Sequence, residues 1–63
     1  MTYTREILIK TIVAGEMVGC DGEKYKQKLK ELYHKWEHES SEKLCIRYNE
    51  LTSVKLTVDA LTP

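Results

Sequence analysis

Two histidines in the middle of the chain have the residue types and spacing of a chemical site. His34 and His38 frame the stretch HKWEH, which matches the H-x-x-E-H pattern of one class of zinc peptidases. Side chains four residues apart lie on one face of a helix, so the two imidazoles could clamp one metal ion. The pattern raises two hypotheses, a catalytic zinc site and a structural one.

A structural zinc site would need two more ligands, and the chain offers Cys20 and Cys45. The resulting order, Cys-x13-His-x3-His-x6-Cys, lacks the two closely spaced cysteines of the usual finger pattern. Helical spacing also places both histidines opposite the apolar stripe of their own helix. The sequence therefore favours two solvent-facing histidines and no bound cofactor. A structural zinc domain that uses Cys20, His34, His38 and Cys45 is kept as an alternative.

Catalysis is the weaker of the two hypotheses because the chain is short. A domain of 63 residues buries only about 60% of the surface that its unfolded chain exposes, which leaves little material for a rigid pocket. The H-x-x-E-H pattern also needs a third ligand and a substrate cleft, and it recurs easily by chance. We expect one small domain over residues 1–63 that is not an enzyme.

Charge and hydropathy describe a chain without a strong electrostatic field. Ten basic and ten acidic residues cancel, so no net charge attracts nucleic acid or an anionic membrane. The most apolar stretch, ILIKTIVAGEMVG, contains Lys10 and Glu16 and is too short to span a bilayer. It also lacks the pattern of a secretory signal. We expect a cytoplasmic location, no membrane contact and reduced cysteines.

The element that carries the histidines is an amphipathic helix from about Glu23 to Glu39. It follows an Asp21-Gly22 turn, in which Asp21 is a suitable N-cap. Its apolar side chains recur with helical spacing, which is more typical of a core than of a binding site. These side chains are Tyr25, Leu29, Leu32 and Trp36, with Tyr33 alongside.

The segment before this helix has the end signals of a helix too, with Thr4 as N-cap and Gly19 just past its end. Apolar residues cover so many of its sides that more than one of them must be buried. The competing interpretation of residues 5–13 is a strand, because β-branched residues are frequent there. The end signals favour the helix.

The last segment fits two structures. As two strands, residues 44–48 and 54–58 alternate between apolar and polar side chains, with NELTS as the hairpin loop. A helix that starts at Ser40 or Ser41 gives the longer pattern, so we favour a helix within residues 41–60. Its apolar arc consists of Leu44, Tyr48, Leu51, Val54 and Val58. The predicted fold is an all-α, compact three-helix domain. The alternative is α+β, two helices followed by a C-terminal β-hairpin.

The function most consistent with these features is binding to another protein. We predict a small non-enzymatic regulatory or adaptor protein, of bacterial or phage type, that acts through apolar helix faces. A small DNA- or RNA-binding transcriptional regulator is the alternative. It is less favoured because glutamates and histidines interrupt the lysines of the second helix, and its aromatic residues lie on the stripe expected to be buried.

One apolar stripe of the first helix has no expected cover within the chain. Ile9, Val13 and Met17 remain when the other faces of this helix pack against the second and third segments. A contiguous apolar stripe is unusual on a soluble monomer. We therefore predict a protein interface at these three residues, used by a homodimer with twofold symmetry or by a different protein.

Overall fold

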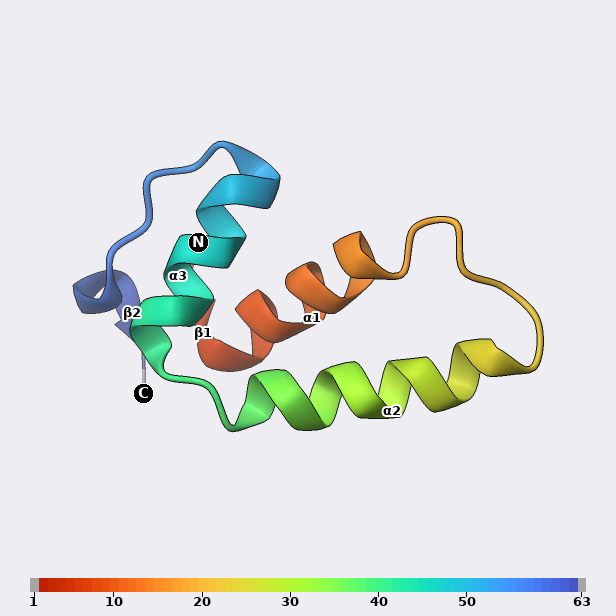
Figure 1. The fold of residues 1–63 in the computed structure, drawn as a ribbon. Helices are drawn as coiled ribbons and strands as arrows, with labels where there is room; N and C mark the ends of the chain where they lie inside the picture. Colours follow the sequence, from red (N-terminus) through yellow and green to blue (C-terminus); the bar gives the residue numbers. More distant parts are fainter. Residues whose placement is uncertain (1, 63) are drawn as a thin grey trace.

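The computed structural model describes residues 2–62 and contains three helices and one pair of very short strands (Figure 1). In chain order these elements are β1 (Tyr3–Thr4), α1 (Arg5–Glu16), α2 (Lys24–Glu37), α3 (Ser41–Thr52), the 3-10 helix η1 (Val58–Ala60) and β2 (Leu61–Thr62). The predicted all-α, three-helix fold is confirmed. Residues 5–13 are helical, and a helix follows Ser40 where the alternative fold would have had a hairpin.

Side-chain caps fix where α1 and α3 begin. Thr4 Oγ1 accepts a hydrogen bond from the Ile7 backbone N–H at 3.2 Å, and Ser40 Oγ accepts one from the Lys43 backbone N–H at 3.3 Å. Both caps agree with the sequence prediction. The N-cap of α2 is Glu23, which makes no side-chain cap hydrogen bond.

The prediction that Asp21 caps α2 is therefore wrong. Gly22 adopts a left-handed conformation with φ 84°, which glycine tolerates because it has no Cβ. The resulting turn lies between Asp21 and the first helical residue, and the Gly22 carbonyl accepts a hydrogen bond from the Tyr25 N–H at 3.1 Å. The chain thus changes direction before the Asp21 side chain could reach the first turn of α2.

The core lies mainly between α1 and α3, with α2 covering it from one side (Figure 1). Its fully buried side chains are Leu8, Ile12, Val13 and Leu44. From α2, only Trp36 is buried, at 6% exposure. The C-terminal half of α2 therefore holds that helix on the core.

Glu16, the last residue of α1, joins all three helices. Its Oε2 accepts a hydrogen bond from Trp36 Nε1 on α2 at 2.9 Å, and its Oε1 lies 3.6 Å from Arg47 Nε on α3. A carboxylate at a helix C-terminus is opposed by the helix dipole. The partners on α2 and α3 offset that effect, so this residue acts as a polar junction between the helices.

Arg5 fixes the turn that connects α2 to α3. Its Nη1 donates to Ser41 Oγ at 2.8 Å, and its Nη2 donates to the backbone carbonyls of Glu37 at 3.2 Å and Glu39 at 2.8 Å. Carbonyls at the end of a helix have no partner within that helix. One guanidinium therefore supplies donors to the end of α2 and positions the start of α3.

Helix α3 ends at Thr52, earlier than predicted, because Ser53 adopts a left-handed conformation with φ 61°. The chain then returns along α3, held by Asn49. Asn49 Nδ2 donates to the Leu56 carbonyl and its Oδ1 accepts from the Leu56 N–H, both at 2.9 Å. Leu56 is buried in this way, whereas Val54 and Val58 are 36% and 44% exposed. The predicted extension of the helical arc to Val58 is wrong.

The two ends of the fold meet in a short parallel pair of strands. Tyr3 pairs with Leu61 and Thr4 with Thr62. The Tyr3 ring packs edge-on against Tyr48, with 6.0 Å between ring centroids. This contact holds β1 on α3. Within the part of the chain that the structure describes, no helix has the length and apolar character needed to cross a membrane.

The molecule is elongated, with principal extents of 38 × 22 × 19 Å and a radius of gyration of 12.0 Å. A fully compact chain of this length would have a radius of gyration of about 11 Å. The difference arises at the N-terminal half of α2, which extends beyond the core (Figure 1). Every residue from 21 to 28 is exposed.

Candidate functional site

The two histidines lie side by side on the solvent face of α2. Their ring centroids are 4.7 Å apart with the planes at 70°, and both side chains are exposed. Cys20 is half-buried and Cys45 is buried in the core. Among residues 2–62, no three histidine, cysteine, aspartate or glutamate side chains gather closely enough to hold a metal ion. The structure therefore does not assemble the alternative zinc site of Cys20, His34, His38 and Cys45.

Cys45 has the environment of a structural residue. Burial raises the pKa of its thiol, so the thiolate, which is the nucleophilic form, is disfavoured. Its side chain is 4% exposed and belongs to the core cluster between the helices. We therefore assign Cys45 a role in the packing of the core.

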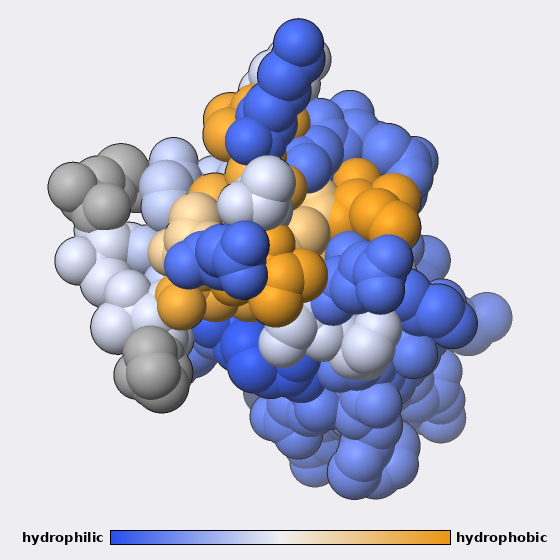
Figure 2. Space-filling view, turned by 90° about the vertical axis from the view of Figure 1, so that its left-hand side faces the viewer, coloured by the Kyte–Doolittle hydropathy of each residue, from blue (hydrophilic) through white to orange (hydrophobic). Residues whose placement is uncertain are grey.

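One set of exposed apolar side chains lies on α3 and the segment after it. Ile46 is 52% exposed and Leu51 38%, in addition to Val54 and Val58. Figure 2 shows this side of the molecule, where hydrophobic patches alternate with hydrophilic side chains. Scattered apolar side chains of this kind are ordinary on a protein surface.

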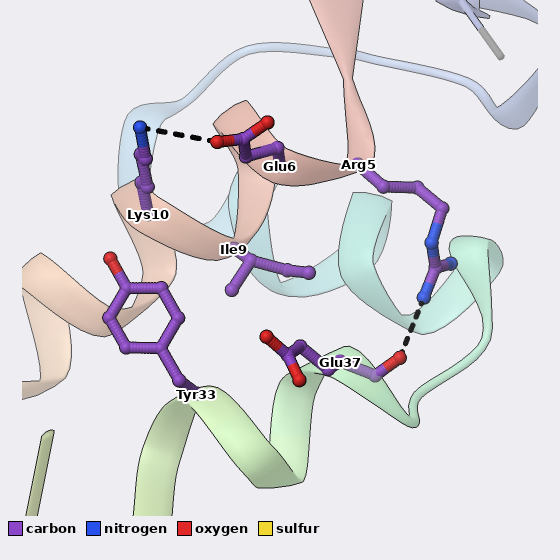
Figure 3. A pocket seen from close by; sticks show the side chains of 6 residues that line it. All are labelled: Arg5, Glu6, Ile9, Lys10, Tyr33 and Glu37. Carbon is purple, nitrogen blue, oxygen red and sulfur yellow. Dashed lines mark hydrogen bonds and ion pairs between the residues drawn. The ribbon is translucent and has the colours of Figure 1, made fainter. Parts of the chain in front are cut away.

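The second apolar surface is a groove where α1 faces α2. Two hollows of about 340 and 380 Å³ share Lys10 and Tyr33 in their walls, so they adjoin and form what we call the α1–α2 groove. The first hollow is further lined by Arg5, Glu6, Ile9 and Glu37 (Figure 3). The second hollow is further lined by Val13, Ala14, Met17, Val18, Tyr25 and Leu29.

The three residues predicted as an interface form the floor of this groove. Ile9, Val13 and Met17 are only 7%, 1% and 6% exposed within a single chain. The expectation that no part of the same chain covers them is therefore wrong. The three residues belong to the core cluster, and Leu29 and Tyr33 of α2 pack against that cluster. The three residues still line the groove, but they offer little surface of their own.

The accessible apolar surface of the groove comes from its rim. Val18, just beyond the end of α1, is 83% exposed, and Tyr25 of α2 is 40% exposed. The connection between them contains Gly19 and Gly22, both left-handed, and a Cβ added at either would meet no atom within 4 Å apart from those of its chain neighbours. This end of the groove is therefore apolar and open, and its two walls are joined by a loosely packed loop.

The other end of the groove is polar and has balanced charges. Lys10 Nζ lies 3.4 Å from Glu6 Oε1. Figure 3 shows the Glu37 carboxylate directed into the hollow beneath Ile9, and the Tyr33 hydroxyl directed toward Lys10. In the described part of the chain, no ion pair involves the Glu37 carboxylate. Two basic and two acidic side chains thus line this hollow.

Charged side chains of both signs lie near the open end. Among the described residues, Lys10 is the only charged one that lines the second hollow, and it is paired with Glu6. Glu23 precedes Lys26 by three residues and Lys30 by seven, so helical spacing places its carboxylate on the same side of α2 as these lysines. Lys26 and Lys30 precede Tyr33 by seven and three residues, which places them on the same side of α2 as the groove. Both are exposed, and no ion pair found between residues 2 and 62 includes either of them. Lys24 and Lys28 instead line a shallow hollow on another side of α2.

Comparison with known proteins gives no match. No protein-family model, curated protein or solved structure matches this chain.

Proposed function

We propose that the protein is a small non-enzymatic regulatory or adaptor protein that binds another protein through the α1–α2 groove. The observation that carries this proposal is the open end of the groove. Val18 and Tyr25 expose apolar surface there, above a floor of core residues. Apolar surface gathered in a hollow and rimmed by polar residues is typical of an interaction site. The proposal includes the bacterial or phage type of regulator and the cytoplasmic location that we predict from the sequence.

Binding to DNA or RNA is the second candidate, and the projecting half of α2 supports it. Lys24, Lys26, Lys28 and Lys30 are all exposed on this part of the helix. Phosphate binding by lysines depends strongly on salt. Glu23 and Glu31 lie among these lysines, however, and the groove is predominantly apolar at its open end. A protein partner fits both the mixed charges of α2 and the apolar open end of the groove, so we favour it.

Site-specific photocrosslinking tests the proposal. A benzophenone amino acid at Ala14, an exposed residue in the groove wall, should crosslink to a polypeptide in nuclease-treated native lysate. The same label at Glu42, exposed on α3, is the matched control and should not crosslink to that polypeptide. Excess unlabelled protein should compete for the crosslink, whereas a Val18→Asp variant should compete poorly.

Either of two results would overturn the proposal. Equal crosslinking from Ala14 and Glu42, or competition by Val18→Asp as strong as by the unchanged protein, would show that the groove is not the binding surface. Salt-sensitive recovery of nucleic acid, with no polypeptide crosslinked at Ala14, would favour the second candidate.

A further inference from the structure

The exposed histidine pair of α2 lies outside the α1–α2 groove, since neither His34 nor His38 lines either hollow. We propose that the two imidazoles together bind a divalent late transition-metal ion, Cu²⁺ or Ni²⁺, with water at its remaining coordination positions. This site differs from the zinc sites that the sequence suggested, because it uses no third protein ligand and neither cysteine. The inference is independent of the proposed function.

The separation of the two rings fits two ligands of one ion. A metal ion such as zinc lies about 2.0–2.1 Å from an imidazole nitrogen, and hence about 3.2 Å from the ring centroid. Two rings that meet at a metal with an angle between about 90° and 109° have centroids about 4.5–5.2 Å apart. The centroids of His34 and His38 are 4.7 Å apart. The two rings therefore already stand at the separation that a shared ion requires.

The backbone that carries the pair is held in place at both histidines. His34 lies within α2, and His38, the residue after its end, keeps a right-handed helical conformation with φ −92° and ψ 0°. The helical spacing of four residues therefore extends to the second ligand. Arg5 donates hydrogen bonds to the carbonyls of Glu37 and Glu39, one on each side of His38. Because this turn is already ordered, binding of an ion costs less backbone entropy than it would in a flexible segment.

The chemistry of the ligands restricts the class of metal. Imidazole is a suitable ligand for Cu²⁺, Ni²⁺ and Zn²⁺, and a given site binds Cu²⁺ most tightly among the divalent first-row ions. Nitrogen and oxygen ligands in a tetragonal arrangement are typical of Cu²⁺ and Ni²⁺. A structural zinc ion has four protein ligands, whereas no three candidate side chains gather anywhere in residues 2–62. Two histidines completed by water therefore suit Cu²⁺ and Ni²⁺ better than zinc.

Charged side chains of both signs lie beside the pair. Lys30 and Glu31 precede His34 by four and three residues, and Lys35 precedes His38 by three. Helical spacing places all three side chains next to the histidines. Two ammonium groups and one carboxylate do not attract a cation, so the affinity must come from the imidazole nitrogens. Binding should therefore require both histidines and depend little on ionic strength.

Titration with NiCl₂ in a calorimeter tests the site on the full, reduced chain. Ni²⁺ is the probe because, unlike Cu²⁺, it does not oxidise thiols. We expect one Ni²⁺ per chain. His34→Ala and His38→Ala should each bind Ni²⁺ at least about tenfold more weakly, because the loss of one ligand removes the chelate. Mg²⁺, which prefers oxygen ligands, should not bind at the same concentrations.

A matched control keeps the amino-acid composition and separates the two histidines. Gln27 and His34 are both exposed on α2. The double variant Gln27→His/His34→Gln leaves two imidazoles eleven residues apart, or about 16–17 Å along the helix axis, which is too far to share an ion. It should bind Ni²⁺ as weakly as His34→Ala, and circular dichroism verifies that it remains helical. Ni²⁺ should also raise the urea concentration at the midpoint of unfolding in the unchanged protein and not in this variant, because the ion binds the folded state.

Three results would overturn the inference. The absence of saturable Ni²⁺ binding up to about 1 mM would show that the pair is not a chelating site. Equal affinities of the unchanged protein and Gln27→His/His34→Gln would show that single imidazoles bind independently. Loss of binding in Cys20→Ala would place the ion at that half-buried thiol instead. None of these results bears on crosslinking from the groove, so the proposed function is tested separately.

Discussion

At the residue scale, Trp36 combines burial with a hydrogen bond across helices. Its side chain is 6% exposed and its indole N–H donates to Glu16. Trp36→Ala should lower the free energy of unfolding by about 3–5 kcal/mol, because it removes a large buried ring. A core of this size rarely supplies more than about 3–5 kcal/mol in total, so the variant should be largely unfolded. Urea unfolding followed by circular dichroism measures the effect.

Two substitutions serve as controls for Trp36→Ala. His34 is exposed on the same helix, and His34→Ala should change the free energy of unfolding by less than about 0.5 kcal/mol. Trp36→Phe keeps most of the apolar volume and removes the hydrogen bond to the Glu16 carboxylate, so its cost should be smaller than that of Trp36→Ala, at about 1.5–3 kcal/mol for the hydrogen bond plus a contribution from the smaller ring. Similar effects of Trp36→Ala and His34→Ala would mean that α2 does not face the core as described.

Asn49 provides a second test at this scale, because its amide makes both hydrogen bonds of the Leu56 backbone. Asn49→Ala leaves a part-buried N–H and C=O without those partners, at a cost of about 1–3 kcal/mol. The amide hydrogen of Leu56 should also exchange faster, while the amides of α1 keep their relative order of protection. Hydrogen exchange followed by NMR distinguishes this from a general loss of stability. Unchanged exchange at Leu56 would contradict the assigned role.

Burial of Cys45 should make the free energy of unfolding decrease at alkaline pH. Burial raises the pKa of the Cys45 thiol in the folded protein above its value in the unfolded chain. The folded state then holds its proton more tightly, so this contribution is complete below the unfolded pKa of about 8.5 and declines as pH rises beyond it. The pKa of Tyr48 is raised as well, mainly by burial and to a smaller extent by Tyr3. This residue therefore also lowers the free energy of unfolding as pH rises, but at higher pH than Cys45.

The expected outcome is a free energy of unfolding that falls between about pH 8.5 and pH 10, with a flatter profile in Cys45→Ala. Urea unfolding at a series of pH values measures both slopes. Cys20, half-buried in the α1–α2 connection, provides the comparison through Cys20→Ala. The assignment fails if the slope below pH 10 is the same in Cys45→Ala as in the unchanged protein.

At the element scale, α2 has two halves with different support. Residues 21–28 are exposed throughout, whereas Leu32, Tyr33 and Trp36 pack against the core cluster. Local opening is easiest where few apolar contacts hold the backbone. Amides of residues 25–28 should therefore exchange much faster than those of residues 32–36, as hydrogen exchange with NMR detection can measure. Uniform protection along α2 would contradict this description.

Helix positions were predictable from short-range patterns, and helix ends only in part. Thr4 and Ser40 are capping residues whose partners lie three residues away, so local sequence is sufficient to recognise them. The end of α3 depends on Asn49 reaching Leu56 and on a left-handed Ser53. Neither leaves a periodic signal, and serine is not a residue that predicts a positive φ. The return of the chain along α3 was therefore missed.

At the scale of the whole molecule, the oligomeric state shows whether the groove binds a second copy of the chain or a different protein. A homodimer was predicted from an apolar stripe that the structure covers within one chain. Sedimentation equilibrium at micromolar concentration should now give a monomer mass near 7.4 kDa that does not rise with concentration. A dimer mass that the exposed groove substitution Val18→Asp abolishes would instead identify a second copy as the partner.

The candidate site was predictable only as far as its floor. Ile9, Val13 and Met17 recur at helical spacing, so the sequence reveals that they share a face. It does not reveal how far α2 extends beyond the core, which is why Tyr25 was placed on the buried stripe and is 40% exposed.

The parallel pairing of Tyr3 with Leu61 and Thr4 with Thr62 determines how the fold responds to mechanical force. A pull applied through the two flanking chain ends acts on β1 at its first residue and on β2 at its last. In a parallel pair these are opposite ends of the ribbon, so the load runs along the strands and strains their hydrogen bonds together instead of opening them one after another. Beyond that pair, the pull reaches α1 through Thr4 and α3 through the Leu56 and Asn49 hydrogen bonds. Tension would thus be resisted on the side of the molecule opposite the open end of the groove.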